Sequence, residues 1–209
     1  MKEYSSTRFI KQNNYTFCGY NLKIARILGA NLGVSAYVWD SGIALCKYFE
    51  KEKISFTGKK VIELGAGTGI VGILAALLGG NVTITDKPKS LMQIRNNVYI
   101  NIPPVCRNRL KVRPLVWGED DANFPTDYDF ILGSDIVYQS DAYPDLVDTL
   151  LHLSSEHTTI YLATEFRTDN GSLAFHEVLL TEYFNCGIVD TSKDKDIAVY
   201  KISKTATSR

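Results

Sequence analysis

Alternating glycines mark the stretch of this sequence that is best suited to bind a ligand. Gly65, Gly67 and Gly69 follow a short apolar run at 61–64 and precede a segment with apolar residues at helical spacing. A strand, a tight turn and a helix in this order present backbone N–H groups and the positive end of the helix dipole at one point. Glycine has no side chain, so the backbone there can come close to a ligand. We therefore expect a nucleotide-like cofactor at this turn; a turn without a ligand is the alternative.

A carboxylate follows the glycines at a useful distance. Asp86 ends a second apolar run, 81–86, and lies 19 residues after Gly67. In a βαβ nucleotide-binding unit the second strand brings an acidic side chain to the ribose hydroxyls, roughly 20 residues beyond the glycines. The alternative is that Asp86 only caps a helix that begins near Pro88. Its pairing with the glycines favours the ribose contact.

The glycine spacing alone fits two cofactors. From Gly67 to Gly72 it matches the G-x-G-x-x-G pattern of dinucleotide-binding proteins, and from Glu63 to Gly69 it fits S-adenosylmethionine-dependent methyltransferases. The C-terminal part decides between them. Two β-like runs, 184–190 and 197–202, are joined by a short polar turn, so they must pair antiparallel. A parallel sheet closed by such a hairpin is the methyltransferase arrangement, and we expect S-adenosylmethionine.

The other segments alternate as an α/β protein requires. We expect helices at about 39–49, 70–78, 88–101, 142–154 and 171–183, strands at 110–116, 130–134 and 158–164, and an N-terminal hairpin within 15–27. Together these elements predict an α/β fold with a seven-stranded Rossmann-like sheet, an antiparallel C-terminal hairpin and a short N-terminal extension. We divide the chain into this extension, residues 1–35, and a methyltransferase domain, residues 36–209.

Several side chains fall where the predicted strands and helices meet the ligand. Trp117 follows the third strand, Ser134, Asp135 and Tyr138 end the fourth, and Trp39 begins the first helix. In open α/β sheets the ligand crevice lies along the carboxyl ends of the strands. A flat aromatic side chain there suits an adenine ring. A place in the core is the alternative for each tryptophan.

Length and composition indicate one ordinary globular domain of 209 residues. The 23 basic and 23 acidic residues leave no net charge, which argues against a general nucleic-acid-binding protein. The four cysteines lack C-x-x-C spacing and nearby histidines, so we expect free thiols, a reducing compartment and no metal site. No apolar run approaches the roughly 18 residues of a membrane span. We expect a cytoplasmic monomer.

Five blocks of residues resemble those of a known family: LGVSAYVWD at 32–40, ELGAGTGIVG at 63–72, VTITD at 82–86, WG at 117–118 and LGSDIVY at 132–138. Over about 15–203 the chain is similar to the methyltransferase-like 21 group of seven-strand protein lysine methyltransferases. Within it, residues 15–19, 58–64 and 79–80 resemble the branch that methylates a lysine of translation elongation factor 1-alpha. Sister branches methylate Hsp70-type chaperones and an AAA ATPase.

The resemblance implies where S-adenosylmethionine binds. The family's cofactor contacts fall on Trp39, Gly65, Ala66, Gly67, Asp86, Trp117 and Ser134. Ser134 departs from the relatives, which usually have alanine at this position; we expect a backbone contact there, so that the cofactor still binds. Asp135 and Tyr138 occupy the family's D-x-x-Y/F position.

Methyl transfer requires a neutral lysine nitrogen. The lysine pKa in water is about 10.4, so most of the amine is protonated at neutral pH. A dry channel beside a cationic sulfonium favours the neutral amine, through desolvation and like-charge repulsion. We therefore expect no strong catalytic base. Our hypothesis is that Asp135 orients the amine and Tyr138 forms a wall of the channel; a helix or turn cap is the alternative for Asp135.

Other titratable residues are weaker candidates. His152, His157 and His176 do not fall at a carboxyl strand end, so we expect surface or core roles for them. Glu165 and Arg167 follow the fifth strand, where they could dock a protein substrate. For both of them, a solvated loop is the interpretation that we prefer.

The sequence thus predicts an S-adenosylmethionine-dependent protein-lysine N-methyltransferase whose partner is elongation factor 1-alpha. The alternatives are a lysine methyltransferase for an Hsp70-type chaperone or an AAA ATPase, and a non-catalytic cofactor-binding scaffold. Intact glycines, Asp86 and Asp135 argue against the scaffold. Methylation of a nucleic-acid base is not expected, because residues 135–138 lack an Asn-Pro-Pro-Tyr motif.

Overall fold

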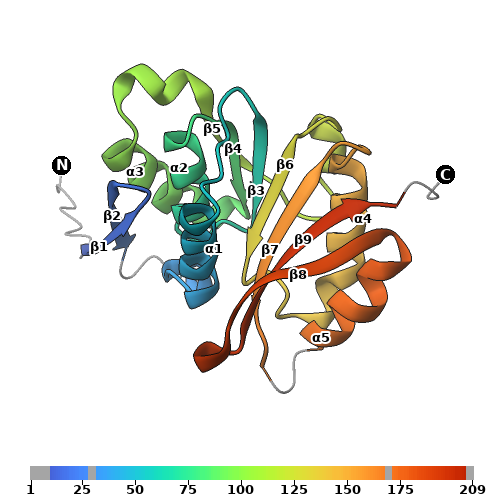
Figure 1. The fold of residues 1–209 in the computed structure, drawn as a ribbon. Helices are drawn as coiled ribbons and strands as arrows, with labels where there is room; N and C mark the ends of the chain where they lie inside the picture. Colours follow the sequence, from blue (N-terminus) through green and yellow to red (C-terminus); the bar gives the residue numbers. More distant parts are fainter. Residues whose placement is uncertain (1–9, 28–31, 168–170, 206–209) are drawn as a thin grey trace, which may run out of the picture.

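A seven-stranded sheet forms the centre of the protein in a computed structural model, which describes residues 10–27, 32–167 and 171–205 (Figure 1). The strand order is β5-β4-β3-β6-β7-β9-β8. The strands are β3 Lys60–Leu64, β4 Asn81–Asp86, β5 Leu110–Pro114, β6 Phe130–Ser134, β7 Thr159–Glu165, β8 Phe184–Ser192 and β9 Ile197–Lys204. Strands β3 to β7 pair in parallel, whereas β9 is antiparallel to both β7 and β8. The predicted sheet and its C-terminal hairpin are confirmed.

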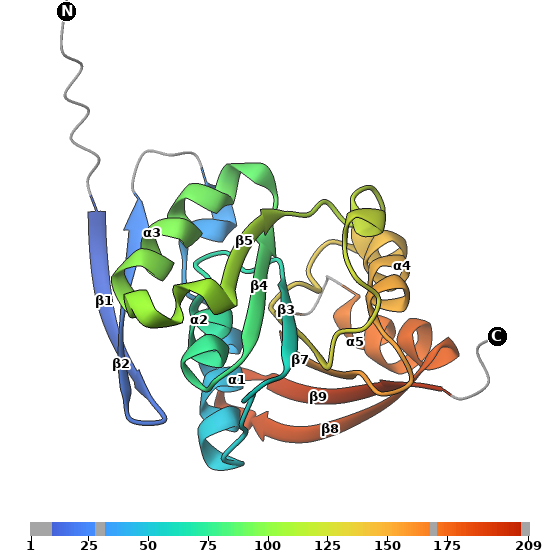
Figure 2. The ribbon, with the colours of Figure 1, turned by 90° about the horizontal axis from the view of Figure 1, so that it is seen from above.

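Helices cover both faces of the sheet (Figures 1 and 2). The helices α1 Asp40–Lys51, α2 Ile70–Leu77 and α3 Leu91–Asn101 lie on one face, and α4 Tyr143–Leu153 and α5 Ser172–Ala174 lie on the other. Short 3-10 turns link them at Gly33–Ala36, Pro88–Ser90, Pro104–Arg109, Asp121–Asn123, Ser140–Ala142, Leu180–Glu182 and Lys193–Lys195. In the part of the chain that the structure describes, no helix has both the length and the apolar character of a membrane span.

Strands β3, β6, β7 and β9 each contribute to two apolar layers. In β3, Val61 packs in a cluster with residues of α1 and α2, while Ile62 and Leu64 belong to the cluster beneath α4. This alternation follows from the two-residue period of a strand. Because helices bury both faces, the parallel strands read as nearly continuous apolar runs, which is the signal that the sequence carried.

An N-terminal hairpin, β1 Ile10–Phe17 and β2 Tyr20–Ile27, lies outside the α1–α3 layer (Figure 2). Its turn uses Cys18 and Gly19, both with positive φ angles. Leu22 and Ile24 of β2 are buried in the same apolar cluster as α1 and α2. The hairpin is therefore attached to the rest of the protein by a shared core. The division of the chain at residue 35 stays a prediction.

The prediction of a single α-helix at 171–183 is wrong. The segment consists of α5, a π-helix at Phe175–Leu179 and a 3-10 turn. Phe175 and Leu180 are five residues apart and both fully buried against the sheet. An i to i+5 turn places such a pair on one side, whereas an α-helix does not.

Candidate active site

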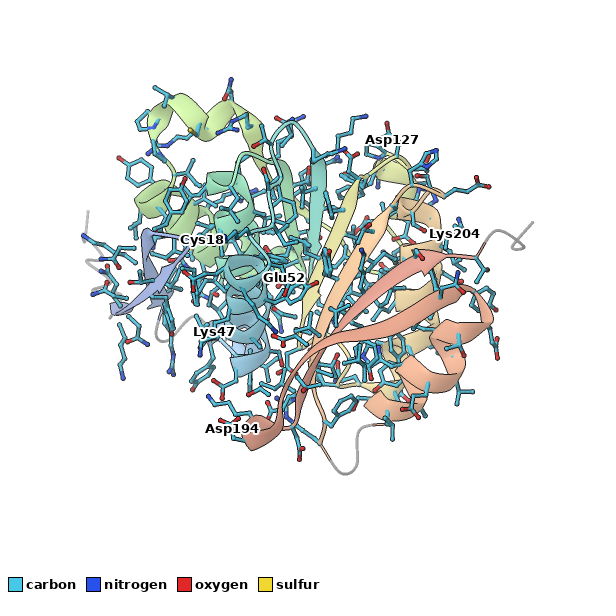
Figure 3. The ribbon with its side chains drawn as sticks, in the orientation of Figure 1. Cys18, Lys47, Glu52, Asp127, Asp194 and Lys204 are labelled. Carbon is cyan, nitrogen blue, oxygen red and sulfur yellow. The ribbon has the colours of Figure 1, made fainter. Side chains whose placement is uncertain are left out.

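A cavity with a volume of about 400 Å³ lies at the carboxyl edge of the parallel strands. Figure 3 shows that Asp127, before β6, and Asp194, at the tip of the β8–β9 hairpin, mark opposite ends of the molecule. The cavity lies at the Asp194 end. Lys195, next to Asp194, pairs with Asp40, and the neighbouring Trp39 lines the cavity. Its size suits a small-molecule ligand. All nine predicted site residues line it: Trp39, Gly65, Ala66, Gly67, Asp86, Trp117, Ser134, Asp135 and Tyr138.

The glycine turn between β3 and α2 forms the floor of this cavity. Gly65 and Gly67 each have a φ angle of 57°, in the left-handed region that glycine adopts without strain. A Cβ atom on Gly65 would lie 2.8 Å from the side chain of Ile136. The Ala66 N–H donates to the Thr85 carbonyl at 3.0 Å and so ties the turn to β4. The glycines thus meet a steric and a conformational need.

Gly72 and Glu63 fix α2 against the sheet behind the turn. A Cβ atom on Gly72 would lie 2.7 Å from Ile84, so the helix approaches β4 closely only without a side chain there. The Gly72 N–H donates to Glu63 Oε2 at 2.9 Å. Burial raises the pKa of Glu63 to about 8, although this hydrogen bond opposes the shift.

Asp86 ends β4 and points at the glycine turn. Its Oδ2 accepts the Gly67 N–H and its Oδ1 accepts the Lys87 N–H, both at 2.7 Å. The side chain does not cap the following turn, whose capping position is Lys87 and lacks a side-chain bond. Burial raises the pKa of Asp86, and the Gly67 hydrogen bond opposes the rise. A carboxylate has about four acceptor sites, so capacity remains for ligand hydroxyls.

Both tryptophans line the cavity, and Trp117 also packs against the apolar cluster beneath α4. Trp39 occupies the position before α1 and is 38% exposed. Its indole N–H donates to the Val34 carbonyl at 2.9 Å, which holds the ring at the cavity rim. Trp117 is half-buried, and its ring lies 3.3 Å from the Cβ position of Gly65. The two rings therefore bound the cavity from different elements, while their contact with a cofactor stays a prediction.

The segment after β6 places Asp135 and Tyr138 at the same cavity. Asp135 has a φ angle of 54°, which is unfavourable for a residue with a side chain, and its N–H donates to the Ala163 carbonyl at 2.8 Å. It is only 7% exposed, and burial raises its pKa against the effect of Arg167. Tyr138 is 36% exposed at the rim. Among the residues that the structure describes, Asp135 makes no capping bond. A strained, buried carboxyl group at a cavity is typical of a functional site.

The expectation of a solvated loop at Glu165 and Arg167 was wrong. Glu165 is the last residue of β7, and Arg167 lines the cavity. The Arg167 guanidinium donates to Asp135 Oδ2 and to Glu165 Oε2, in each case at 2.7 Å. The sequence showed charges at a strand end but not that Arg167 binds Asp135, the residue that follows β6.

Sequence reasoning also missed three amides on α3. Asn97 accepts the Ala25 N–H at 2.8 Å and donates to the carbonyls of Ala25 and Thr68 at 3.1 and 3.0 Å. Gln93 accepts the Ile27 N–H at 3.0 Å and donates to the Ser35 carbonyl at 2.8 Å. The third is Asn101, which accepts the Lys23 N–H and donates to its carbonyl. Their spacing of four residues was the available signal.

The histidines and cysteines lie away from this chemistry. His176 is buried, bonded through Nε2 to Thr164 at 2.8 Å, and burial lowers its pKa to about 3. None of the three histidines lines the cavity. The four cysteines are free thiols. Within residues 10–27, 32–167 and 171–205, no three His, Cys, Asp or Glu side chains come together as metal ligands would.

Comparisons with known proteins agree with this geometry. The sequence profile of the lysine methyltransferase family matches residues 19–181. The chain is 48% identical to EEF1A lysine methyltransferase 3 of Xenopus tropicalis, over 95% of this chain and 88% of that one. It is 47% identical to the Mus musculus protein of the same name, over 92% and 82%. It is 43% identical to Protein N-lysine methyltransferase METTL21A of Xenopus tropicalis, over 90% and 84%.

Solved structures support the fold alone, since their sequences differ widely. A Thermus thermophilus 16S rRNA N2 G1207 methyltransferase, in complex with AdoMet and guanosine, has a TM-score of 0.66 at 15% identity. The match covers 94% of this chain and 51% of that one. The magnesium protoporphyrin IX methyltransferase of Synechocystis, solved with bound SAH, has a TM-score of 0.58 at 14% identity, with 79% and 83% covered.

Proposed function

This chain belongs to the lysine methyltransferase family, and we propose that it transfers a methyl group from S-adenosylmethionine to a lysine side chain of translation elongation factor 1-alpha. One observation carries the choice of substrate. Two relatives whose names specify elongation factor 1-alpha are 48% and 47% identical to this chain across almost its full length. The choice of enzyme class has separate support from the cavity, because all nine predicted residues converge there.

The residues of the cavity fit the cofactor. Asp86 keeps acceptor capacity for the ribose hydroxyls, and the turn from Gly65 to Gly67 brings backbone close to the ligand. The two tryptophans, Trp39 and Trp117, and the backbone at Ser134 complete the proposed contacts. When bound, S-adenosylmethionine supplies an electrophilic methyl group on a sulfonium sulfur. The protein must then orient the acceptor amine and exclude water.

Asp135 and Tyr138 are proposed to handle the lysine. The buried Oδ1 atom of Asp135 has no hydrogen-bond partner among the described residues, so it is available to accept an N–H from the amine. Tyr138 lines the cavity and is 36% exposed, and we propose that its ring forms one wall of the path of the lysine side chain. Burial raises the Tyr138 pKa above its usual value, so the phenol stays neutral at physiological pH. Neither residue has to act as a strong base, because desolvation favours the neutral amine.

A labelling assay tests the substrate directly. Recombinant protein is incubated with radiolabelled S-adenosylmethionine and purified elongation factor 1-alpha, an Hsp70-type chaperone or an AAA ATPase, and the products are separated on a gel. We expect label in elongation factor 1-alpha, and mass spectrometry then identifies the lysine and the number of methyl groups. Label only in the chaperone or the ATPase would overturn the proposed substrate. S-adenosylhomocysteine binding without label in any cell-lysate protein would favour the scaffold.

Two further properties belong to the same proposal. Because its proposed substrate works in translation, we place the protein in the cytoplasm. We also propose that it acts as a monomer, since one chain brings all nine proposed site residues together. Fractionation of cells and light scattering of the purified protein test these two points; an organelle fraction or a stable dimer would contradict them.

A further inference from the structure

One guanidinium group holds two carboxylates together at the cavity. Arg167 Nη2 lies 2.7 Å from both Asp135 Oδ2 and Glu165 Oε2. The side chains are 35% exposed for Arg167, 4% for Asp135 and 31% for Glu165. The guanidinium carbon is 5.1 Å from the ring centre of Trp39, within the range of a cation–π contact. This cluster at the ends of β6 and β7 carries one negative charge in excess.

The two oxygens of Asp135 have different surroundings as a result. Oδ2 is bound to Arg167, whereas Oδ1 is buried without a partner among the described residues. The backbone of Asp135 is fixed by its N–H bond to the Ala163 carbonyl. Arg167 therefore sets the rotation of the carboxyl group, and this rotation leaves Oδ1 available to a donor in the cavity.

We propose that Arg167 is a positioning residue for methyl transfer, which orients Asp135 and prevents the site from binding a protonated lysine too strongly. The inference rests on the proposed function. Without Arg167, Asp135 and Glu165 would be two uncompensated carboxylates, which favour an ammonium group over a neutral amine. A protonated nitrogen has no lone pair to form the new N–C bond, for which the methyl carbon would leave the sulfonium sulfur and S-adenosylhomocysteine would be released. The guanidinium charge therefore helps the amine lose its proton, which leaves to solvent, before it attacks.

The other charges around the cluster are either paired or more distant in the cavity. Asp40 of α1 pairs with Lys195 of the β8–β9 turn at 2.8 Å, and Asp86 is bonded to backbone N–H groups. The remaining charged or titratable groups near the cavity are Tyr37, Lys87, Lys89, Tyr138 and the exposed Asp141, and Lys195 acts on Glu165 at longer range. Arg167 is thus the cation in direct contact with Asp135, and its removal changes the local field most.

The pH dependence of kcat tests this role. In Arg167→Gln, the acidic limb of the kcat profile should move upward on the order of one pH unit, as the loss of one partly screened charge at close range predicts. Activity should fall about tenfold at pH 7 and largely recover near pH 9.5. Arg167→Lys keeps the charge and should keep the limb near that of the wild type. The KM for the protein substrate should not rise in Arg167→Gln.

A structural role alone would give a different result. It would lower kcat equally at all pH values, and the conservative lysine variant would not restore the limb. Lys195→Gln is the matched control, because it removes an exposed cation that pairs with Asp40 and acts on Glu165 at longer range but does not contact Asp135. The acidic limb of the kcat profile of Lys195→Gln should stay at the same pH as in the wild type. Melting temperature and S-adenosylhomocysteine affinity show that each variant is folded and saturated with cofactor during the assay.

A second measurement needs no substrate. A carbon-13 NMR titration of Asp135 in the free protein should show a higher midpoint in Arg167→Gln and a near-normal one in Arg167→Lys. An unchanged midpoint, or an equal shift in both variants, would overturn the inference. If the wild type does not methylate elongation factor 1-alpha, the proposed function fails, while this titration still decides the role of Arg167.

Discussion

Two buried aspartates illustrate how the same side chain takes different tasks in this protein. Asp86 and Asp135 are each 7% exposed, and burial raises the pKa of both. Asp86 accepts backbone N–H groups from the glycine turn and from its own strand end. Asp135 is held by a guanidinium group and keeps one oxygen without a partner among the described residues. We propose that the first arrangement serves the cofactor and that the second presents an acceptor to the substrate.

Their alanine variants should therefore have opposite defects. Asp86→Ala should weaken S-adenosylhomocysteine binding roughly 10- to 100-fold in isothermal titration, the cost of a lost charge-assisted contact. Asp135→Ala should lower kcat about 100-fold or more and leave this affinity within about threefold, because it acts on the amine. Equal loss of binding and turnover in Asp135→Ala, or no loss of either, would reject its proposed role.

Glu63 should make stability depend on pH. Its pKa is about 8 in the folded state and about 4.3 in an unfolded chain, so the folded state holds the extra proton between these values. The stability that this proton contributes is present in acid and is lost as the pH rises toward 8. Glu63→Gln keeps the acceptor for Gly72 but does not ionise. Its melting temperature relative to the wild type should rise from pH 5 to 8, by the equivalent of a few kcal/mol, and then level off. A constant difference would contradict the shift.

At the scale of elements, side chains of α3 bind the backbone groups of β2 that do not pair with β1. The outward N–H groups of Lys23, Ala25 and Ile27 donate to Asn101, Asn97 and Gln93 in turn. These amides form what we call the amide ladder. Two of its members also bind the carbonyls of Ser35 and Thr68, next to the cavity. The ladder therefore connects the N-terminal hairpin with the glycine turn between β3 and α2.

Two variants of the ladder separate these connections. Asn97→Ala leaves buried backbone groups of Ala25 and Thr68 without partners, so we expect a loss of about 2–4 kcal/mol in unfolding free energy. It should also speed hydrogen exchange at the Ala25 amide and weaken cofactor binding. Asn101→Ala, at the open end of the ladder, should loosen the hairpin and leave cofactor affinity unchanged. Equal effects of the two variants on S-adenosylhomocysteine affinity would show that the ladder does not influence the glycine turn.

Local sequence patterns were enough to predict the sheet, the glycine turn and the position of Asp86 beside it. They are visible because apolar periodicity, turn residues and a fixed spacing all lie within one βαβ unit. The ladder and the Arg167 cluster were missed because their partners are distant in the sequence. Gln93 and Asn97 look like an ordinary polar face of α3, and nothing in 165–167 indicates a partner on another strand. The π-helix was missed because only packing against the sheet selects it.

For the whole molecule, a net charge of zero conceals a separation of charge. Residues 87–118 contain seven Lys and Arg and no Asp or Glu, and they build α3 and the edge strand β5. Residues 119–166 contain 11 Asp and Glu and no Lys or Arg, and they build β6, α4 and β7. The cavity lies between them, with Lys87 on one side and Asp135 on the other. Such a field orients a charged partner as it approaches.

We expect the acidic side to receive the protein substrate, because the acceptor residue is a cation in solution. Asp141 is exposed and lies between the cavity residues Gln139 and Ala142. Asp141→Lys should raise the KM for the protein substrate several-fold at about 50 mM salt and less at about 300 mM, where the Debye length is shorter. Glu182→Lys, an exposed reversal away from the cavity, is the control. Equal KM values for the two variants would exclude this orientation.

The amide ladder also sets a limit on its own length. Four residues of helix advance roughly 6.0 Å, whereas two residues of strand advance roughly 6.6 Å, so each rung adds a mismatch of about 0.6 Å. Across the two intervals between three rungs the difference reaches about 1.2 Å. A fourth amide placed one turn further along α3 would fall short of the next strand carbonyl, and lengthening the hairpin would leave its new backbone groups to water.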